Sequence, residues 1–296
     1  MKFVTHYFPY IFAIFSPMFL FAESIHFTQK IETSFFQTKE GKLAYTKLGF
    51  GNKKFILLPG IGDRKESYLP LAMLLAKEGT VYSFDLRGLG ESDTSFTSYG
   101  PKETALDTIS FIQENRLENI YIIANSMTAA SAVYIQSHER KRVLGLILSG
   151  PFVRDKEPMS FGLKSMLQIM FRGPWGPSAW VKFYESLFPI QPPNDLEERK
   201  DKLKENLKEE GRMFALRSML FAPKTECEVE LSNAKGNHII IMGLKDPDFP
   251  SPEEEALWIR DTIGGKVYLY ENGGHYPFVE EPNRFFRDIQ TLWQKK

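Results

Sequence analysis

The stretch that decides the fold is residues 120–130, IYIIANSMTAA. Its apolar run at residues 120–123 predicts a strand buried on both faces of a sheet, and residues 128–136 predict a helix of small side chains. Ser126 stands at the turn between them. Such a sharp turn holds a serine hydroxyl above the sheet, where it can act as a nucleophile. The alternative is a serine that only caps the helix.

This turn also requires small residues two positions before and two positions after Ser126, because strand and helix approach each other there. Ala124 and Thr128 occupy these positions. Alanine meets the requirement, whereas threonine is larger than the glycine that the pattern expects. Thr128 is therefore the position at which the sequence departs from the pattern.

Strands and helices alternate along the chain on both sides of this stretch. The first two predicted strands flank Lys39-Glu40-Gly41 and indicate a hairpin. The alternation predicts the α/β class, with a mostly parallel sheet covered by helices on both faces. The strands of this hairpin are predicted at residues 35–38 and 43–46. Further strands are predicted at residues 55–58, 81–84, 143–148, 239–242 and 267–270, and helices at residues 68–76, 105–111, 252–262 and 282–293.

Residues 151–236 break the alternation, because they contain no convincing core strand. A charged stretch at residues 196–212 is typical of a solvated helix face. We predict an inserted helical cap at residues 151–236, between a first part of the core at residues 23–150 and a second part at residues 237–296. The apolar side chains of the cap either line a pocket over Ser126 or only pack the cap onto the core. They are Phe161, Met166, Met170, Phe171, Trp175, Trp180, Phe183, Tyr184 and Phe188.

An acid and a histidine each follow a predicted strand further along the chain. Asp246 and Asp248 follow one such strand, and His275 follows the next, after two glycines. Asp and Pro are also common in β-turns, so either acid can be structural. A serine, an acid and a histidine in this chain order, each after a strand, predict a catalytic triad that includes Ser126 and His275.

Acyl transfer also needs two backbone N–H groups that stabilise an oxyanion. One is expected at Met127, the residue after the nucleophile. We assign the other to Ile61, in the segment Gly60-Ile61-Gly62, because its N–H would point back toward the serine. A plain glycine turn would have the same sequence.

Four segments of the chain resemble motifs of one known family, the α/β-hydrolase superfamily in its capped, esterase-like branch. Residues 57–60, LLPG, are similar to its His-Gly oxyanion segment, with proline in place of histidine. Residues 85–92, DLRGLGES, match a D-x-R-G-x-G-x-S loop that is mainly structural in the family. Residues 243–246 match the acid motif G-x-x-D, and residues 274–280 resemble the histidine loop. The resemblance covers the chain from about residue 40 to its end.

The resemblance implies an α/β-hydrolase fold, a mostly parallel sheet flanked by helices with an inserted helical cap. It favours Asp246 over Asp248, and it implies that Ser126, Asp246 and His275 cleave a carboxylic ester with an apolar acyl or aromatic group through an acyl-enzyme. A serine nucleophile disfavours the haloalkane dehalogenase and epoxide hydrolase branches, which use a carboxylate. C–C bond hydrolases, thioesterases and cofactor-free peroxidases use the same triad, and their reactions are the alternatives within the enzymes. A non-catalytic ligand-binding or interaction protein on a hydrolase scaffold is the alternative from another class.

The composition limits the partners. Lys and Arg number 37, as do Asp and Glu, so no net charge favours nucleic acid. The five histidines show no metal-ligand spacing, and we expect neither a metal nor a cofactor. The single cysteine, Cys227, allows no internal disulfide, and the acids next to it indicate a small semi-buried residue rather than a nucleophile. The expected partner is a small-molecule substrate, an apolar ester.

The N-terminus has the pattern of a secretory signal peptide. Lys2 precedes an apolar run that ends in a small residue, Ala22, before Glu23. Two prolines and the short length of the run argue against a membrane-spanning helix. We therefore expect residues 1–22 to direct export to the periplasm or the extracellular space. The alternative is an uncleaved N-terminus that anchors the protein and keeps it close to a membrane.

Overall fold

The computed structural model describes residues 31–155 and 160–294. The predicted signal or anchor segment at residues 1–22 lies outside the described residues. Within the described ranges, no helix is both long enough and apolar enough to cross a bilayer.

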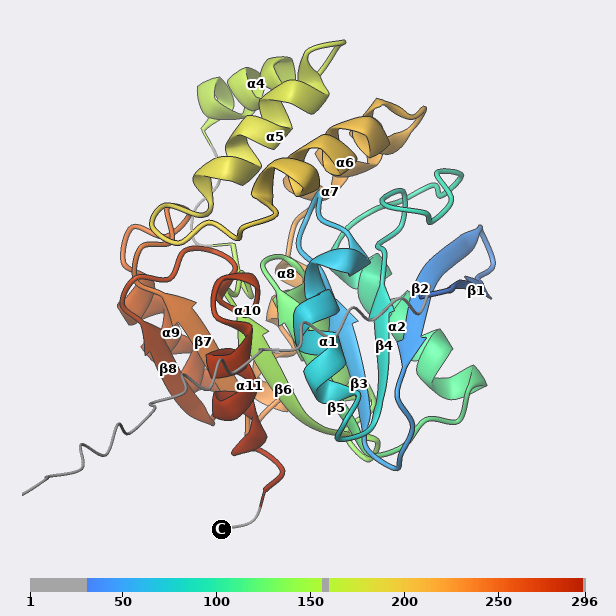
Figure 1. The fold of residues 1–296 in the computed structure, drawn as a ribbon, viewed down its shortest axis with the longest axis vertical. Helices are drawn as coiled ribbons and strands as arrows, with labels where there is room; N and C mark the ends of the chain where they lie inside the picture. The colour runs from blue at the N-terminus through green and yellow to red at the C-terminus, as the bar shows by residue number, and fades with distance from the viewer. Residues whose placement is uncertain (1–30, 156–159, 295–296) are drawn as a thin grey trace, which may run out of the picture. The chain divides into compact units, whose positions relative to one another are not determined.

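The described chain is built on one eight-stranded sheet with the strand order β1-β2-β4-β3-β5-β6-β7-β8 (Figure 1). β1 (Thr33–Gln37) and β2 (Lys42–Leu48) form the predicted hairpin, and β2 pairs antiparallel with β4 (Thr80–Phe84). All neighbours from β4 to β8 are parallel, which confirms the predicted sheet. The other strands are β3 (Lys54–Leu58), β5 (Ile120–Asn125), β6 (Val143–Ser149), β7 (Ile239–Gly243) and β8 (Lys266–Tyr270).

Helices cover both faces of this sheet. The chain passes from β3 through α1 (Leu69–Leu75) to β4, and from β5 through α3 (Thr128–His138) to β6 in the opposite direction along the sheet. Crossovers between parallel strands are right-handed, so α1 and α3 lie on opposite faces. α1 packs against α11 (Pro282–Gln290), and α3 packs against α2 (Pro101–Glu114). The remaining core elements are a 3-10 turn at Lys65–Tyr68, α9 (Pro252–Ile263) and α10 (Pro277–Glu280).

The central strands contain apolar runs because they are covered from both sides. Every residue of β5 and of β7 is buried, and such strands have no face on which polar side chains could be solvated. Since the strands from β4 to β8 run parallel, their carboxyl ends share one edge of the sheet. The loops that carry Ser126, Asp246 and His275 all leave from that edge.

Only helices connect β6 to β7 in the described part of residues 151–236. Figure 1 shows α4, α5 and α6 beyond one end of the strands, and α6 packs against both α5 and α7. We call this region the cap. Its elements are α4 (Phe161–Met170), α5 (Gly176–Ser186), α6 (Leu196–Lys208), α7 (Arg212–Phe221), α8 (Thr225–Glu228) and a 3-10 turn at Leu231–Asn233.

The apolar residues of the cap differ in burial, and Met170 and Phe183 are half-buried. Phe171, Trp180, Tyr184 and Phe188 are buried, whereas Phe161, Met166 and Trp175 are 87%, 54% and 56% exposed. The residues of the buried group include those through which the cap contacts the core. The exposed group faces solvent and does not pack against the core.

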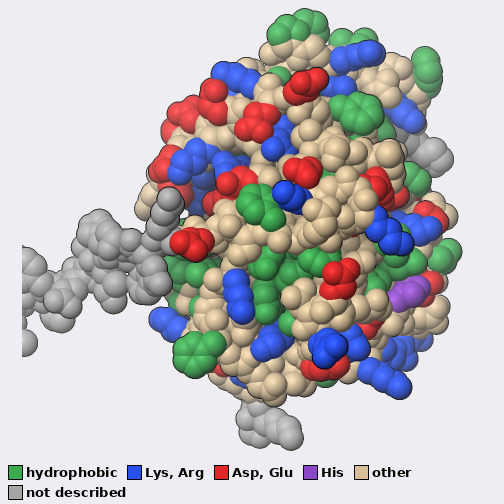
Figure 2. Space-filling model, turned by 90° about the vertical axis from the view of Figure 1, so that its right-hand side faces the viewer, with side chains coloured by type: hydrophobic (Ala, Val, Ile, Leu, Met, Phe, Trp, Pro, Cys, Tyr) green, Lys and Arg blue, Asp and Glu red, His purple; other side chains and the backbone are tan. Residues whose placement is uncertain are grey.

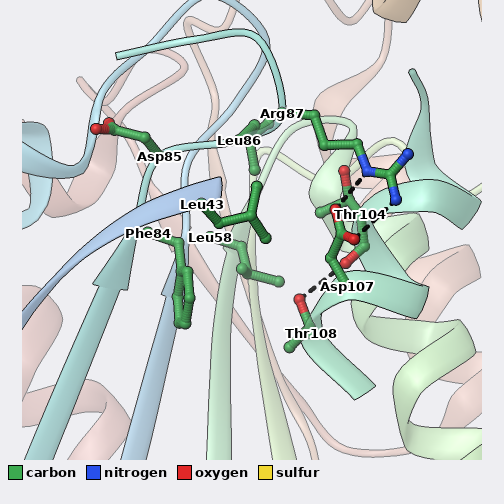
Figure 3. A pocket seen from close by; sticks show the side chains of 9 residues that line it. All are labelled: Leu43, Leu58, Phe84, Asp85, Leu86, Arg87, Thr104, Asp107 and Thr108. Atoms are coloured by element: carbon green, nitrogen blue, oxygen red, sulfur yellow. Dashed lines mark hydrogen bonds and ion pairs between the residues drawn. The ribbon is translucent and has the colours of Figure 1, made fainter. Parts of the chain in front are cut away.

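The loop after β4, residues 85–92, is held in place by buried polar contacts. Asp85 accepts hydrogen bonds from the N–H and the Nζ of Lys65, both at 2.8 Å. Arg87 pairs with Asp107, whose Oδ1 lies 2.8 Å from Arg87 Nη2 (Figure 3). The cavity beside these residues measures about 10 Å³, which is room for about one water molecule. This loop therefore supports the fold and offers no substrate pocket.

Candidate active site

Ser126 lies on the turn between β5 and α3, at the carboxyl edge of the sheet. Its φ angle is +60°, a left-handed backbone conformation that is strained for a residue with a side chain. The Ser126 N–H donates to Ser149 O at 3.1 Å, and Ser126 O accepts from Phe152 N at 3.1 Å, so both sides of the turn are tied down. The side chain is only half-buried, so a small molecule can reach it.

Thr128 fits the turn because its hydroxyl forms hydrogen bonds that a glycine at this position could not form. The side chain is fully buried, and Oγ1 lies 2.9 Å from Leu58 O and 2.8 Å from Asn125 O. The same oxygen accepts a hydrogen bond from Asn125 N at 3.1 Å. Thr128 therefore joins the end of β5 to the end of β3, and the departure from glycine is accommodated.

His275 and Asp246 form the closest polar pair of the candidate site. His275 Nδ1 lies 2.7 Å from Asp246 Oδ2, and both side chains are buried. Asp248 Oδ2 lies 3.9 Å from the same nitrogen, which is beyond hydrogen-bond distance. The Asp248 N–H instead donates to Asp246 Oδ1 at 3.0 Å. Of the two acids that follow β7, Asp246 is thus the hydrogen-bond partner of the histidine.

The charges around His275 favour its protonated form. Burial alone would lower the pKa of His275, but the carboxylate of Asp246, which also accepts its hydrogen bond, outweighs burial, and the pKa rises to about 9. Asp248 and Glu280 act in the same direction. The site therefore stabilises the imidazolium that a histidine becomes when it takes a proton from a serine.

Asn125, which sequence reasoning missed, ties the histidine loop to the serine turn. Its Nδ2 donates to Ser149 O at 3.0 Å and to His275 O at 3.1 Å. The hydrogen bonds of His275 within the described residues go to Asp246, Asn125 and Leu187, so none joins its ring to Ser126. In resting enzymes that bond often tightens only when a substrate binds. In the sequence, only its position directly before Ser126 indicated that Asn125 belongs to the site.

Two further residues hold the histidine loop. The carboxylate of Glu280 accepts the Gly274 N–H at 3.0 Å and 2.9 Å, and burial raises the pKa of Glu280 to about 7. The His275 N–H donates to Leu187 O, in the cap, at 3.0 Å. The motif at residues 274–280 contained Glu280, but only the fold reveals what its side chain does.

Ile61 and Met127, the expected oxyanion donors, lie on two segments that meet at Ser126. A Cβ added to Gly60 would lie 3.1 Å from Ser126 Cβ, so the loop after β3 passes directly beside the serine. Met127 stands at the N-terminus of α3. Across the described ranges, neither N–H donates to a protein acceptor. Unpaired N–H groups on either side of a serine are the donors that an oxyanion needs.

The cap meets the glycine loop through Trp180. Its Nε1 lies 3.4 Å from Gly62 O, and a Cβ added to Gly62 would lie 2.3 Å from the same nitrogen. A cavity of about 280 Å³ lies next to this contact, between the start of α1 and the helices α5 and α6. Polar, charged and apolar residues line it: Asp63, Arg64, Glu66, Ser67, Leu69, Pro70, Tyr184, Asp195, Glu198, Arg199, Lys202 and Leu203.

One group of side chains in the described ranges has ligand atoms close enough to hold a metal ion. It consists of Asp246, Asp248 and His275, with these atoms within 4.8 Å of one another. A carboxylate that orients a histidine produces the same spacing without a metal.

Cys227 is buried, and burial raises the pKa of its thiol to about 12, which makes it a poor nucleophile.

Comparison with known proteins agrees with this fold. A family model described as the alpha/beta hydrolase family matches residues 55–289. The chain belongs to the α/β-hydrolase family. The fold class predicted from the sequence is therefore confirmed, and the protein is an enzyme of the hydrolase class. No curated protein matches the sequence.

Solved structures share the fold of this α/β-hydrolase. An esterase from Exiguobacterium antarcticum has a TM-score of 0.76 and 21% identity, over 89% of this chain and 100% of its own. A thermophilic esterase from Thermogutta terrifontis has a TM-score of 0.70 and 21% identity, over 88% and 97%. A bromoperoxidase from Bacillus anthracis has a TM-score of 0.74 and 15% identity, over 89% and 100%. At these identities the likeness establishes the fold alone, and the reaction has to be argued from the site.

Proposed function

We propose that this α/β-hydrolase is a serine esterase that cleaves carboxylic esters, with Ser126 as nucleophile, His275 as general base and Asp246 as the acid that orients it. One observation carries the proposal. A serine with a φ angle of +60° stands at the sheet edge that also carries a histidine and a carboxylate 2.7 Å apart. A strained serine turn beside a buried His–Asp pair is the arrangement that acyl transfer requires.

In the proposed first step, His275 accepts the proton of the Ser126 hydroxyl as the serine oxygen bonds to the ester carbonyl carbon. The carbonyl oxygen becomes an oxyanion that the N–H groups of Ile61 and Met127 stabilise. The tetrahedral intermediate then expels the alcohol, which leaves with the proton from His275. An acyl-serine remains.

In the second step, water gives a proton to His275 and attacks the acyl-serine carbonyl. The bond to the serine oxygen breaks, the carboxylic acid leaves, and His275 returns the proton to Ser126. Asp246 stays ionised throughout, because its part is to hold one tautomer of the imidazole and to stabilise the imidazolium. The atoms balance without a cofactor.

We assign the apolar part of the substrate to the buried and half-buried aromatic residues of the cap. Trp180 contacts the glycine loop, and its ring packs against Phe171 and Phe183, with ring centroids 5.1 Å and 5.2 Å away. An apolar acyl chain or aromatic ring bound to Ser126 would extend toward this cluster. Apolar walls with a few polar groups are typical of sites for small organic substrates.

The test is covalent labelling with a fluorophosphonate, together with hydrolysis of p-nitrophenyl esters of increasing acyl length. Wild type should be labelled and active, and Ser126→Ala should lose both. Ser149→Ala is the matched control, since Ser149 is buried on the neighbouring strand and its Oγ has no hydrogen-bond partner in the described residues. Equal labelling of wild type and Ser126→Ala would refute the nucleophile. Labelling without ester hydrolysis would refute the substrate class.

We further propose that residues 1–22 direct export and are removed. A cation, an apolar run and a small residue before Glu23 support this, as in signal peptides generally. Mass spectrometry of the protein from its native host should find an N-terminus near residue 23 in the exported fraction. An intact Met1 in the cytoplasmic fraction would refute export, and an intact Met1 in the membrane fraction would establish the anchored form.

A further inference from the structure

The outward side of α4 is apolar where a surface helix is ordinarily polar. Its exposed positions include Phe161, Met166 and Ile169, which are 87%, 54% and 66% exposed. Only Lys164 and Gln168 are polar among the exposed residues of this helix. An isolated exposed apolar residue is ordinary, but three on one helix indicate a surface that something covers.

Trp175 extends this surface into the turn between α4 and α5. The indole is 56% exposed, and its Nε1 donates to Ile169 O at 3.2 Å, which fixes the ring beside the end of α4. Phe161, Met166, Ile169 and Trp175 are called the apex patch below. Figure 2 shows hydrophobic side chains next to Lys and Arg side chains at the upper end of the molecule, where Figure 1 places α4.

The charged residues of the segment that contains the apex patch, residues 160–184, have one sign. Residues 160–184 contain Lys164, Arg172 and Lys182 and no acid. All three cations are exposed, and none forms an ion pair within the described residues. Arg172 also lies near a fourth cation, Arg217, whose pKa is lowered by burial and by repulsion from Arg172. The segment that contains the patch therefore has an excess of positive charge that no ion pair among the described residues neutralises.

A second helix of the cap shows that this imbalance is local. Three of the four lysines of α6 are paired along the helix: Lys200 with Glu197 at 2.8 Å, Lys202 with Glu198 at 2.5 Å and Lys208 with Glu205 at 2.6 Å. The exposed face of α6 is therefore an ordinary solvated surface. The combination of exposed apolar residues and unpaired cations belongs to α4 and the start of α5.

We propose that the apex patch docks the cap onto a lipid surface that carries anionic headgroups. Phe161, Met166 and Ile169 enter the boundary between headgroups and acyl chains, and Trp175 lies at the headgroup level, where indoles concentrate. Lys164, Arg172 and Lys182 face the anionic headgroups. Charge complementarity selects this occupant, because an apolar surface on a segment with unpaired cations suits an anionic bilayer and repels a second copy of itself.

The expected effect of the cations follows from their number. Each Lys or Arg near an anionic bilayer contributes about fivefold to the partition coefficient. Lys164→Gln combined with Arg172→Gln should thus weaken binding about 30-fold. Lys202→Gln combined with Lys208→Gln removes the same charge from α6 and should change binding less than about twofold.

The experiment uses the full chain and vesicles of equal parts phosphatidylglycerol and dibromo-phosphatidylcholine, with tryptophan emission as the readout. Bromine quenches only an indole that reaches the lipid, so this measurement reports on the patch even if residues 1–22 also bind. We expect quenching in wild type, its loss in Trp175→Phe and its persistence in Trp258→Phe, the half-buried control. Raising the salt to 1 M should reduce binding, because the headgroup attraction is screened.

Apolar contact is tested separately. Phe161→Ser should lower vesicle binding about tenfold, whereas Phe50→Ser should leave it unchanged. Phe50 is 91% exposed and lies just before β3, at the opposite edge of the sheet from the cap. The control therefore removes an equally exposed phenyl ring from a surface that is not proposed to bind lipid.

Three outcomes would overturn the proposal. Co-sedimentation with vesicles without quenching at Trp175 would assign binding to residues 1–22. Equal binding by the α4 and α6 charge variants would remove the electrostatic argument. A concentration-dependent dimer without lipid, dispersed by Phe161→Ser and showing no quenching, would identify a second copy as the occupant.

Discussion

Replacing Asp246 with asparagine removes one charge from the site and keeps the shape of the side chain. In the structure the carboxylate accepts the hydrogen bond of His275 Nδ1 at 2.7 Å and also accepts the Asp248 N–H at 3.0 Å. An amide can present a donor to Nδ1 and so hold the wrong imidazole tautomer. The same change at Asp248 alters a side chain that lies 3.9 Å from the ring and makes no hydrogen bond to it.

The size of the effect follows from the pKa of His275. Burial lowers this pKa, but Asp246, with smaller contributions from Asp248 and Glu280, raises it from 6.5 to about 9, a net preference for the imidazolium of about 3 kcal/mol. Asp246→Asn loses this stabilisation together with the tautomer. We expect kcat to fall about ten-thousandfold, equivalent to about 5 kcal/mol of barrier. Asp248→Asn should lower kcat by less than about tenfold.

The assay is steady-state hydrolysis of p-nitrophenyl butyrate, with fluorophosphonate labelling rates as a measure of nucleophile activation alone. Asp246→Asn should lower the free energy of unfolding in urea by up to about 3 kcal/mol at neutral pH, because the raised pKa of His275 also stabilises the folded state. Both variants should still unfold in one cooperative transition and be folded under the assay conditions, which excludes loss of fold as the cause. Asp246→Asn should be slow in both assays, and Asp248→Asn close to wild type in both. A crippled Asp248→Asn together with a mild Asp246→Asn would refute the assignment of the acid.

Three further predictions test other parts of the site. His275 must be unprotonated to accept the serine proton, and its pKa is raised to about 9. We therefore expect kcat/KM to increase as the pH rises from about 7 to about 9. A pH–rate profile that is flat over this range would contradict the role of Asp246. Thr128→Val leaves the buried Asn125 N–H without its acceptor and should lower the free energy of unfolding by about 1–3 kcal/mol in urea, whereas Thr128→Ser keeps the hydroxyl and should stay near wild type. Trp180→Ala should change the preferred acyl length in the p-nitrophenyl ester series while fluorophosphonate labelling continues. Trp175→Ala changes an exposed residue and should leave the preferred acyl length as in wild type. The same acyl-length profile in both variants would mean that the cap does not select the substrate.

The sequence by itself determined the sheet and the chain order of the candidate residues. Strands such as β5 and β7 are covered on both faces, so they can contain almost only apolar side chains and are visible as short apolar runs. The runs at β5, β7 and β8 are each followed within five residues by Ser126, Asp246 or His275, and parallel strands bring such residues to one edge. Ser126, an acid and His275 could therefore be named before any coordinates were known.

Tertiary structure decided which of Asp246 and Asp248, two positions apart in one turn, hydrogen-bonds to His275. The motif match favoured Asp246, but only the distances of 2.7 Å and 3.9 Å to His275 Nδ1 distinguish them geometrically. Thr128 is a similar case. Its size suggested a poor fit, and the fit depends on Leu58 O, a partner 70 positions away in the sequence.

The cap is where the sequence determined least. Aromatic residues at helical spacing predicted helices, but not which rings face the core, since that depends on neighbours from distant parts of the chain. Trp175 and Trp180 lie five positions apart, and only the second has a core segment beside it, the loop at Gly62. Burial is a property of the packed layers, so only the tertiary structure could separate the tryptophan beside the candidate site from the tryptophan on the outer surface.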